Sequence, residues 1–194
     1  CSMRAITFDI EAIVPNFTRG RLDVNEMDLT VVGIHDSSTG EYSSFLKEEL
    51  PKLWTILENA DMLIGFNSDT FDIPLLNRYY PGDLTKVRSL DILSEVHKAL
   101  GRRIRLDLLA QATLGRGKSG DGGKANVWWQ EGKYDLVREY CIEDVRLTRE
   151  LYDYALKNGH LKYKDLNKKK DIQIDTTLWE AEQTAPALTH TLGI

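Results

Sequence analysis

The chain has 194 residues, of which 42% are hydrophobic and 28% charged, and its formal net charge at pH 7 is -5. This length allows a substantial core and suits one domain with at most an appendage. No apolar run approaches the roughly 18 residues of a membrane span, so we expect no membrane partner. The negative charge excludes binding to nucleic acid through bulk positive charge, but it leaves local recognition open.

The chain has two cysteines, Cys1 and Cys141, and they lie far apart in the sequence. Cys141 falls within a helical pattern, which argues against a disulfide framework or a zinc site. The first strand begins almost at once, and no signal peptide is visible. We therefore expect the protein in a reducing cytoplasm.

Residues 5–11, with the sequence AITFDIE, predict a β-strand that has one apolar face and one acidic face. Every second residue is apolar, and a period of two places Asp9 and Glu11 together on the opposite face. Acidic residues are depleted in strands, and two carboxylates on one face repel each other unless a cation lies between them. The strand therefore suggests a cation site.

The rest of the chain alternates between strand and helix patterns. Three strands joined by turns come first and predict an antiparallel meander, and a short apolar strand and several amphipathic helices follow. The expected strands are 5–11, 29–35, 41–46, 62–66 and a short one at 87–90, and the expected helices are 47–59, 73–80, 90–100, 106–114 and 134–158. This order predicts a mixed sheet in an α/β layer fold.

Two further segments lack a regular pattern. Residues 115–123 form a glycine and lysine loop, but Lys118 and Ala125 occupy positions that a phosphate-binding loop needs as glycine and as serine or threonine. The polar segment after residue 160 predicts an irregular or truncated extension. We expect a domain over 3–160 and an extension over 161–194.

A second acidic motif follows the buried strand at 62–66, where Asn67 and Asp72 occur. Sites in open α/β sheets collect at the carboxyl ends of such strands. Taken alone, Asp72 has a simpler explanation as a partner of the helix N-terminus, and Asn67 as a turn residue.

A third motif lies in the long helix, where Tyr140 and Asp144 are one turn apart. The helical spacing places Asp144 on the stripe that faces the core, where a charge is costly unless it is paired, hydrogen-bonded or bound to metal. A core tyrosine beside a satisfied aspartate would explain the pair equally well. Glu139 points to the charged side and is interpreted as solvated.

Together, the three motifs resemble the exonuclease motifs of the DEDD superfamily. The segments that carry the resemblance are FDIE at 8–11, GFN at 65–67 with Asp72, and YCxxDV at 140–145. The resemblance covers roughly 4–158 and is strongest to the 3′-5′ exonuclease domains of family B DNA polymerases and their free-standing bacterial relatives. It implies a ribonuclease H-like α/β fold, in which a mixed sheet of a three-strand antiparallel meander plus parallel strands is flanked by helices. The chain is similar to the Tyr-type branch, since the His-type branch would place histidine where Glu139 stands.

The resemblance implies hydrolysis of phosphodiester bonds at 3′ ends by a two-metal mechanism, with Mg²⁺ or Mn²⁺ as the ions. In this hypothesis Asp9 bridges both ions. Glu11 and Asp144 complete the binding site of the ion on the nucleophile side, and Asp72 supports the other ion. Tyr140 has an unperturbed pKa near 10, so it would orient the attacking water rather than act as its base.

A substrate strand would need stacking and phosphate contacts as well. We expect Asn67 to contact the terminal nucleotide or a water. The candidates for base stacking are Phe71, Trp128 and Trp129, and those for phosphate contacts are Arg102, Arg103, Arg105 and Lys124. Each also has a simpler explanation, because Phe71 suits a core, the tryptophans suit packing of the loop on the long helix, and the cations suit a solvated surface.

Two alternatives stay open at this point. The chain could be a ribonuclease H-like module that binds nucleic acid without catalysis, although all four carboxylates and the tyrosine are present. It could act on RNA, since no motif identifies a contact to the 2′-hydroxyl; single-stranded DNA is favoured because of the polymerase resemblance. The chain has no room for a polymerase or helicase domain, so a partner of that kind is left undetermined.

Overall fold

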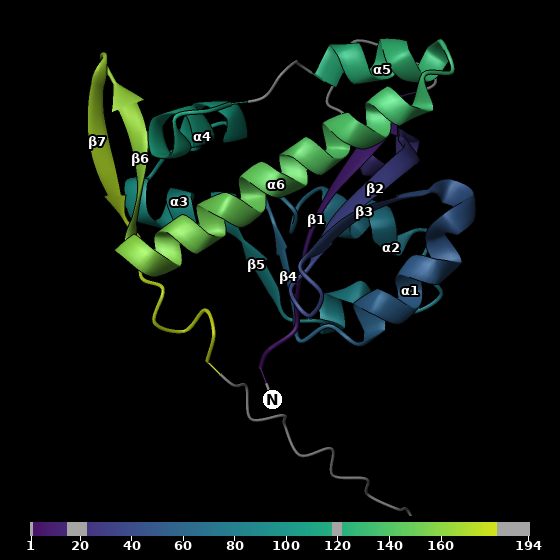
Figure 1. Ribbon diagram of the computed structural model, residues 1–194, viewed down its shortest axis with the longest axis horizontal. Coiled ribbons are helices and arrows are strands. Elements are labelled where there is room, and N and C mark those ends of the chain that lie inside the picture. Colours follow the sequence, from purple (N-terminus) through teal and green to yellow (C-terminus); the bar gives the residue numbers. More distant parts are fainter. Residues whose placement is uncertain (1, 15–22, 118–121, 182–194) are drawn as a thin grey trace, which may run out of the picture.

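The computed structural model describes residues 2–14, 23–117 and 122–181. Its centre is a five-stranded sheet in the order β3-β2-β1-β4-β5 (Figure 1). The strands are β1 (Ala5–Ile13), β2 (Asp28–Asp36), β3 (Glu41–Leu46), β4 (Met62–Gly65) and β5 (Ser89–Asp91). The strand with the acidic face, β1, thus lies in the middle of the sheet.

The sheet is mixed, as predicted. Strands β1, β2 and β3 form an antiparallel meander, while β4 runs parallel to both β1 and β5. Parallel strands need a crossover, and α1 supplies it between β3 and β4. The expected fold class, a meander plus parallel strands flanked by helices, is confirmed.

Helices cover both faces of this sheet (Figure 1). The helices are α1 (Leu50–Glu58), α2 (Asp72–Asn77), α3 (Ile92–Leu100), α4 (Leu106–Leu114), α5 (Gly122–Gln130) and α6 (Tyr134–Asn158). Side chains of α1 and α2 pack with one face of β1, and side chains of α6, α3 and α4 pack in a second cluster on the other face. No helix in the described part of the chain is long and apolar enough to cross a membrane.

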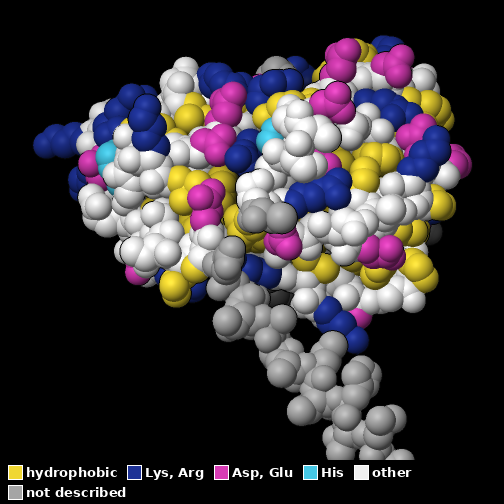
Figure 2. All heavy atoms as spheres, turned by 60° about the horizontal axis from the view of Figure 1, so that its bottom comes forward, with side chains coloured by type: hydrophobic (Ala, Val, Ile, Leu, Met, Phe, Trp, Pro, Cys, Tyr) yellow, Lys and Arg dark blue, Asp and Glu magenta, His cyan; other side chains and the backbone are white. Residues whose placement is uncertain are grey.

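The structure differs from the sequence prediction after residue 160. Instead of an irregular segment, residues 160–173 form an antiparallel hairpin of β6 (His160–Asp165) and β7 (Lys168–Gln173). The run of lysines hid β7, but Leu161 and Ile172 pair across the hairpin and are buried against the domain. Figure 2 shows lysine and arginine side chains gathered at the end of the molecule where this hairpin lies.

A second difference is α5, which occupies residues assigned in part to the loop at 115–123. Two glycines begin it, so the sequence pattern is weak there. Residues 1, 15–22, 118–121 and 182–194, which include part of that loop, Lys118 and the end of the expected extension, lie outside the described residues.

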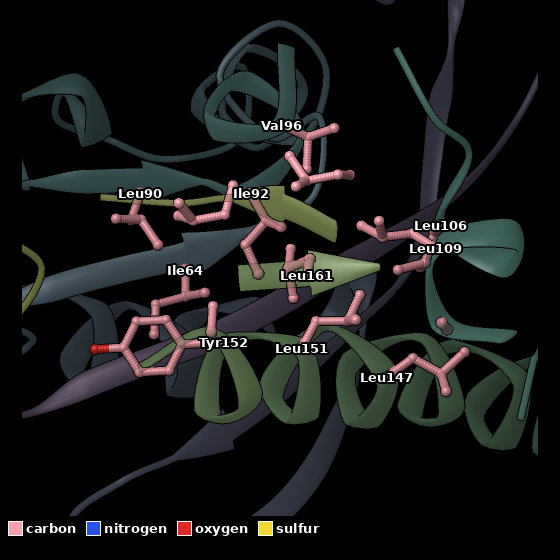
Figure 3. Close-up of a cluster of buried hydrophobic side chains, with 14 of the residues drawn as sticks. Ile64, Leu90, Ile92, Val96, Leu106, Leu109, Leu147, Leu151, Tyr152 and Leu161 are labelled. Carbon is pink, nitrogen blue, oxygen red and sulfur yellow. The ribbon is translucent and has the colours of Figure 1, made fainter. Parts of the chain in front are cut away.

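The core confirms the alternation in β1. Ile6, Phe8 and Ile10 lie in the cluster with α1 and α2. On the opposite face, side chains of α6 such as Leu151 and Tyr152 meet those of the strands and of β6 (Figure 3). Burying each such large side chain contributes roughly 1.5–3 kcal/mol, so the apolar halves of β1 and α6 fix where their polar residues lie.

Candidate active site

The acidic face of β1 lies under α6. Asp9 pairs with Gly33 of β2, and a register shift follows between Glu11 and Ala12. Both carboxylates are half-buried. Because β1 is central and the bulge comes directly after Glu11, these two side chains project from a rigid element at the point where regular pairing is interrupted.

Helix α6 crosses the sheet closely at Gly33. A Cβ atom on Gly33 would lie 3.0 Å from the Sγ of Cys141 and 3.1 Å from a methyl carbon of Val145. The absence of a side chain at this position therefore lets the helix approach β1 and β2. This contact sets the height of Tyr140 and Asp144 above the sheet.

The thiol of Cys141 lies among the carboxylates. Its Sγ is 3.3 Å from the backbone oxygen of Asp9 and 3.7 Å from a carboxylate oxygen of the same residue. Burial raises the pKa of this thiol well above its usual value, and the charges of Asp9, Glu11 and Asp144 raise it further. The thiol therefore stays neutral, and carboxylates of β1 and α6 act on it electrostatically.

Ligand atoms of Asp9, Glu11 and Cys141 lie within 4.8 Å of one another. Carboxylate oxygens suit Mg²⁺ and Mn²⁺, whereas a protonated thiol is a poor ligand for such hard ions. The donor set thus fits a hard divalent cation held by the carboxylates, with Cys141 supporting Asp9 rather than binding the ion.

Asp72 joins this group from α2. Strand β4 ends at Gly65 while β1 continues, which leaves the N–H of Ile10 without a strand partner on that side. That N–H donates to a carboxylate oxygen of Asp72 at 3.0 Å. Burial raises the pKa of Asp72 well above its usual value, and the charge of Asp9 raises it further. A buried carboxylate close to another is relieved by a bound cation.

The loop after β4 is held in place by Asp91. Asp91 accepts hydrogen bonds from the N–H groups of Asn67 at 2.8 Å and Asp69 at 3.1 Å, and it also caps α3. Asn67 adopts a positive φ of 59°, which asparagine tolerates better than most residues. Its side-chain oxygen accepts from Thr70 at 2.8 Å.

The aromatic candidates pack within the protein. The ring of Trp128 meets that of Tyr140 edge-on, with centroids 6.2 Å apart, and Trp129 lies 4.4 Å from the ring of Tyr134. Tyr140 itself is buried on α6, one turn before Asp144. Phe71 is half-buried against the cluster of α1 and α2. The simpler packing explanations thus describe what these side chains contact.

The basic candidates do not form one patch. Arg103 donates to the side-chain oxygen of Asn67 at 2.7 Å, which brings two predicted substrate residues together. Arg102 instead lies over the ring of Tyr163 in β6. Arg105 pairs with Asp107 in α4 at 3.0 Å. Lys124 lies exposed on α5.

Three residues of this site were absent from the sequence prediction: Gly33, Asp91 and the thiol of Cys141. Asp91 had a local signal, because an aspartate directly before a helical pattern is typical of an N-cap. Cys141 lies on the same helical stripe as Asp144, but its contact with Asp9 joins residues far apart in sequence. Gly33 carried no such signal.

Comparisons with known proteins agree with this architecture. A family model described as the RNase_H superfamily matches residues 6–156. A solved structure of the family B DNA polymerase from the hyperthermophilic archaeon Pyrobaculum calidifontis aligns with a TM-score of 0.64 and 19% sequence identity, over 80% of this chain and 25% of that chain. At this identity the likeness shows the fold. A search of curated proteins gave no match. The predicted ribonuclease H-like fold and the resemblance to family B DNA polymerases are confirmed.

Proposed function

The chain belongs to the RNase_H superfamily, and from this premise we propose that it is a metal-dependent nuclease that removes nucleotides from the 3′ ends of single-stranded nucleic acid. One observation carries the proposal: ligand atoms of Asp9 and Glu11 lie within 4.8 Å of one another beside the thiol of Cys141, Asp144 follows one turn after Cys141 on α6, and Asp72 accepts a hydrogen bond from the residue next to Asp9. Four carboxylates from three elements are more negative charge than a buried structural site tolerates without cations.

The carboxylates would hold two divalent ions, Mg²⁺ or Mn²⁺. When bound, such ions lower the pKa of a coordinated water and neutralise charge on the phosphate. Asp9 is central to the group and would contribute to both ions. Glu11 and Asp144 would complete the binding site of the ion that holds the attacking water. Asp72 would support the second ion from the α2 side.

Two further residues would position the reactants. Tyr140 would hydrogen-bond the attacking water, and the ring of Trp128 restricts how its phenol ring can turn. Asn67 would contact the terminal nucleotide, and because Arg103 donates to its side-chain oxygen, its amide N–H groups would make that contact.

The substrate preference is proposed as DNA because the resemblance is to family B DNA polymerases. The chain aligns with only 25% of the polymerase chain, so that protein's own activity does not transfer to this one. Digestion of matched single-stranded DNA, single-stranded RNA and 3′-recessed duplex, side by side, tests the preference. Faster digestion of RNA would reverse it.

Substitution of the carboxylates tests the proposed function. We expect Asp9→Ala and Asp144→Ala each to lower the rate of mononucleotide release from a 3′-labelled oligonucleotide by about 100-fold or more, because an ion that supplies several kcal/mol is lost. The matched control is Glu139→Ala, on the exposed side of the same helix, and it should stay within about twofold of the parent.

The measurement has a clear contrary result. If either aspartate variant keeps activity within a few fold of the parent, the assigned site is wrong. If the parent itself releases no nucleotide with Mg²⁺ or Mn²⁺, the chain is a binding module instead.

A further inference from the structure

The hairpin β6–β7 presents an unbalanced positive charge to solvent. Its inner side contributes Leu161, Tyr163 and Ile172 to the core, while the lysines of both strands lie on the outer side or near the turn. Two of these lysines are neutralised, because Lys162 pairs with Asp171 and Lys170 with Asp165.

Three lysines at the outer end of the hairpin lack such a partner. Among the described residues, no carboxylate lies within ion-pair distance of Lys164, Lys168 or Lys169. Moreover, Lys164 and Lys169 stand directly opposite each other across the two strands. Like charges in this position destabilise a hairpin, whereas an anion bound between them would relieve the repulsion. Although the chain as a whole carries a net charge of -5, this end of the hairpin is locally positive.

A basic loop connects this hairpin to the candidate active site. Arg102 lies over the ring of Tyr163 at 5.1 Å and its charge acts on both Asp165 and Lys170. The next residue, Arg103, contacts Asn67. Two consecutive arginines therefore link the hairpin with the loop that leads into Asp72.

We propose that the outer end of the hairpin, made of Lys164, Lys168 and Lys169, binds backbone phosphates of the substrate strand upstream of the cleaved end. The proposal rests on the proposed function for the identity of the strand's 3′ end, but the surface itself is argued from charge alone. The occupant is single-stranded nucleic acid, because its phosphates repeat along one strand and can contact several cations gathered at one end of the hairpin.

Helix α6 and the hairpin together set the separation of the two regions. About 21 Å of helix separates Asp144 from Asn158, after which β6 begins. A strand that occupies both regions must therefore extend several nucleotides beyond its reacting end. The hairpin should matter for long substrates and not for short ones.

Binding of a fluorescein-labelled 20-nucleotide oligo(dT), measured by anisotropy in EDTA at several salt concentrations, tests the surface without hydrolysis. We expect the variant K164Q/K168Q/K169Q to bind at least about tenfold more weakly than the parent at 50 mM salt. The slope of log K against log salt should fall by about 2, since each phosphate contact to a single strand contributes roughly 0.7. The matched control is K47Q/K52Q/K86Q, which removes equal charge from exposed positions elsewhere and should leave the slope unchanged.

Kinetics supply the second measurement. The hairpin variant should lose about tenfold in kcat/KM on the 20-nucleotide strand and should match the parent on a trinucleotide. Equal loss on both substrates, an unchanged salt slope, or no binding by the parent would each overturn the inference. If the hairpin variant hydrolyses the strand and its salt slope is unchanged, the proposed nuclease function is supported and the hairpin surface is contradicted. A hairpin-dependent slope in a protein that hydrolyses nothing would support the surface and contradict the nuclease.

Discussion

At the scale of single residues, the candidate site depends on a missing side chain. Gly33 allows Cys141 to contact the backbone of Asp9, and this contact holds the strand and the helix that carry three of the four carboxylates. Nothing at Gly33 touches substrate. Gly33 acts by setting the distance between β1 and α6. Catalysis by paired ions is sensitive to such distances.

We expect Gly33→Ala to destabilise the protein by about 1–3 kcal/mol, because the added methyl group overpacks the contact with Cys141 and Val145. Nuclease activity should fall by about tenfold or more as α6 moves away from β1. Urea unfolding and kcat measure the two effects. In a Cys141→Ala background the same change should cost less, and an equal cost in both backgrounds would contradict this account.

Asp36 makes a separate contribution to stability. It accepts hydrogen bonds from Arg4, at the start of β1, and from Ser38 in the turn after β2. The Arg4 guanidinium lowers the pKa of this carboxyl to about 2. A depressed pKa means that the stabilisation is present above the unfolded value near 4 and is lost as the pH falls toward 2.

We therefore expect Asp36→Asn to lower the free energy of unfolding by about 1 kcal/mol at pH 7, after allowance for solvent screening of the partly exposed Arg4. The difference between variant and parent should vanish between pH 4 and pH 2 in denaturant titrations. Asp107→Asn, which breaks an exposed ion pair with Arg105, serves as control and should change stability by no more than about 0.5 kcal/mol. A difference for Asp36→Asn that persists at pH 2 would show that its charge is not the cause.

At the scale of elements, the hairpin turn contains an unusual residue. Leu166 and Asn167 form the two-residue connection between β6 and β7, with φ values of 46° and 66°. Turns with two positive φ values favour asparagine and glycine, and leucine carries a steric penalty in this region. Leu166 is also 93% exposed, so it gains little from burial.

Replacing Leu166 by asparagine should stabilise the protein by about 1 kcal/mol, which raises the Tm by roughly 2–4 °C for a chain of this size. Thermal unfolding followed by circular dichroism measures the shift. The control is Leu178→Asn, at another exposed leucine that lacks a positive φ, and it should leave the Tm nearly unchanged. A lower Tm for the Leu166 variant would mean that its side chain makes a stabilising contact.

The same scale shows what the sequence could predict. Strand β1 and helix α6 were predicted from periodicity because each buries a continuous apolar stripe, so local pattern and tertiary contact agree. The sequence of β7 consists mainly of lysines, which give no strand pattern. The strand forms because Ile172 packs against Leu161 on the other side of the turn. Helix α5 begins with glycines and depends on packing of Trp128 and Trp129 against α6. The contacts of Arg103 with Asn67 and of Cys141 with Asp9 join distant parts of the chain, so no short-range pattern contains them.

At the scale of the whole molecule, the proposed metal site would couple ion binding to folding. Asp72 is buried, and the nearby charge of Asp9 disfavours its ionised form. A divalent ion that binds only the folded chain removes this repulsion and stabilises the fold by mass action. The site should therefore be visible in stability measurements that involve no substrate.

We expect saturating Mn²⁺, at about 100 times its Kd, to stabilise the parent by about 2.7 kcal/mol and to raise its Tm by roughly 5–10 °C at pH 7. EDTA should reverse the shift. The variant D9N/D144N should show no more than a small part of it, while Glu139→Gln, from the exposed side of α6, should behave as the parent. An equal shift in the double variant would place the ion elsewhere.

The length of α6 has a consequence for the products of digestion. About 21 Å of helix separates Asp144 from Asn158, and the three lysines lie farther along the chain, at the turn end of the hairpin. This spacing cannot adjust as the substrate shortens. A strand that is degraded from its 3′ end will at some point no longer reach the hairpin, and its release will then compete with further cleavage. A complete digest should thus leave short oligonucleotides as well as mononucleotides, and the length of these oligonucleotides would report the distance from the candidate active site to the hairpin lysines.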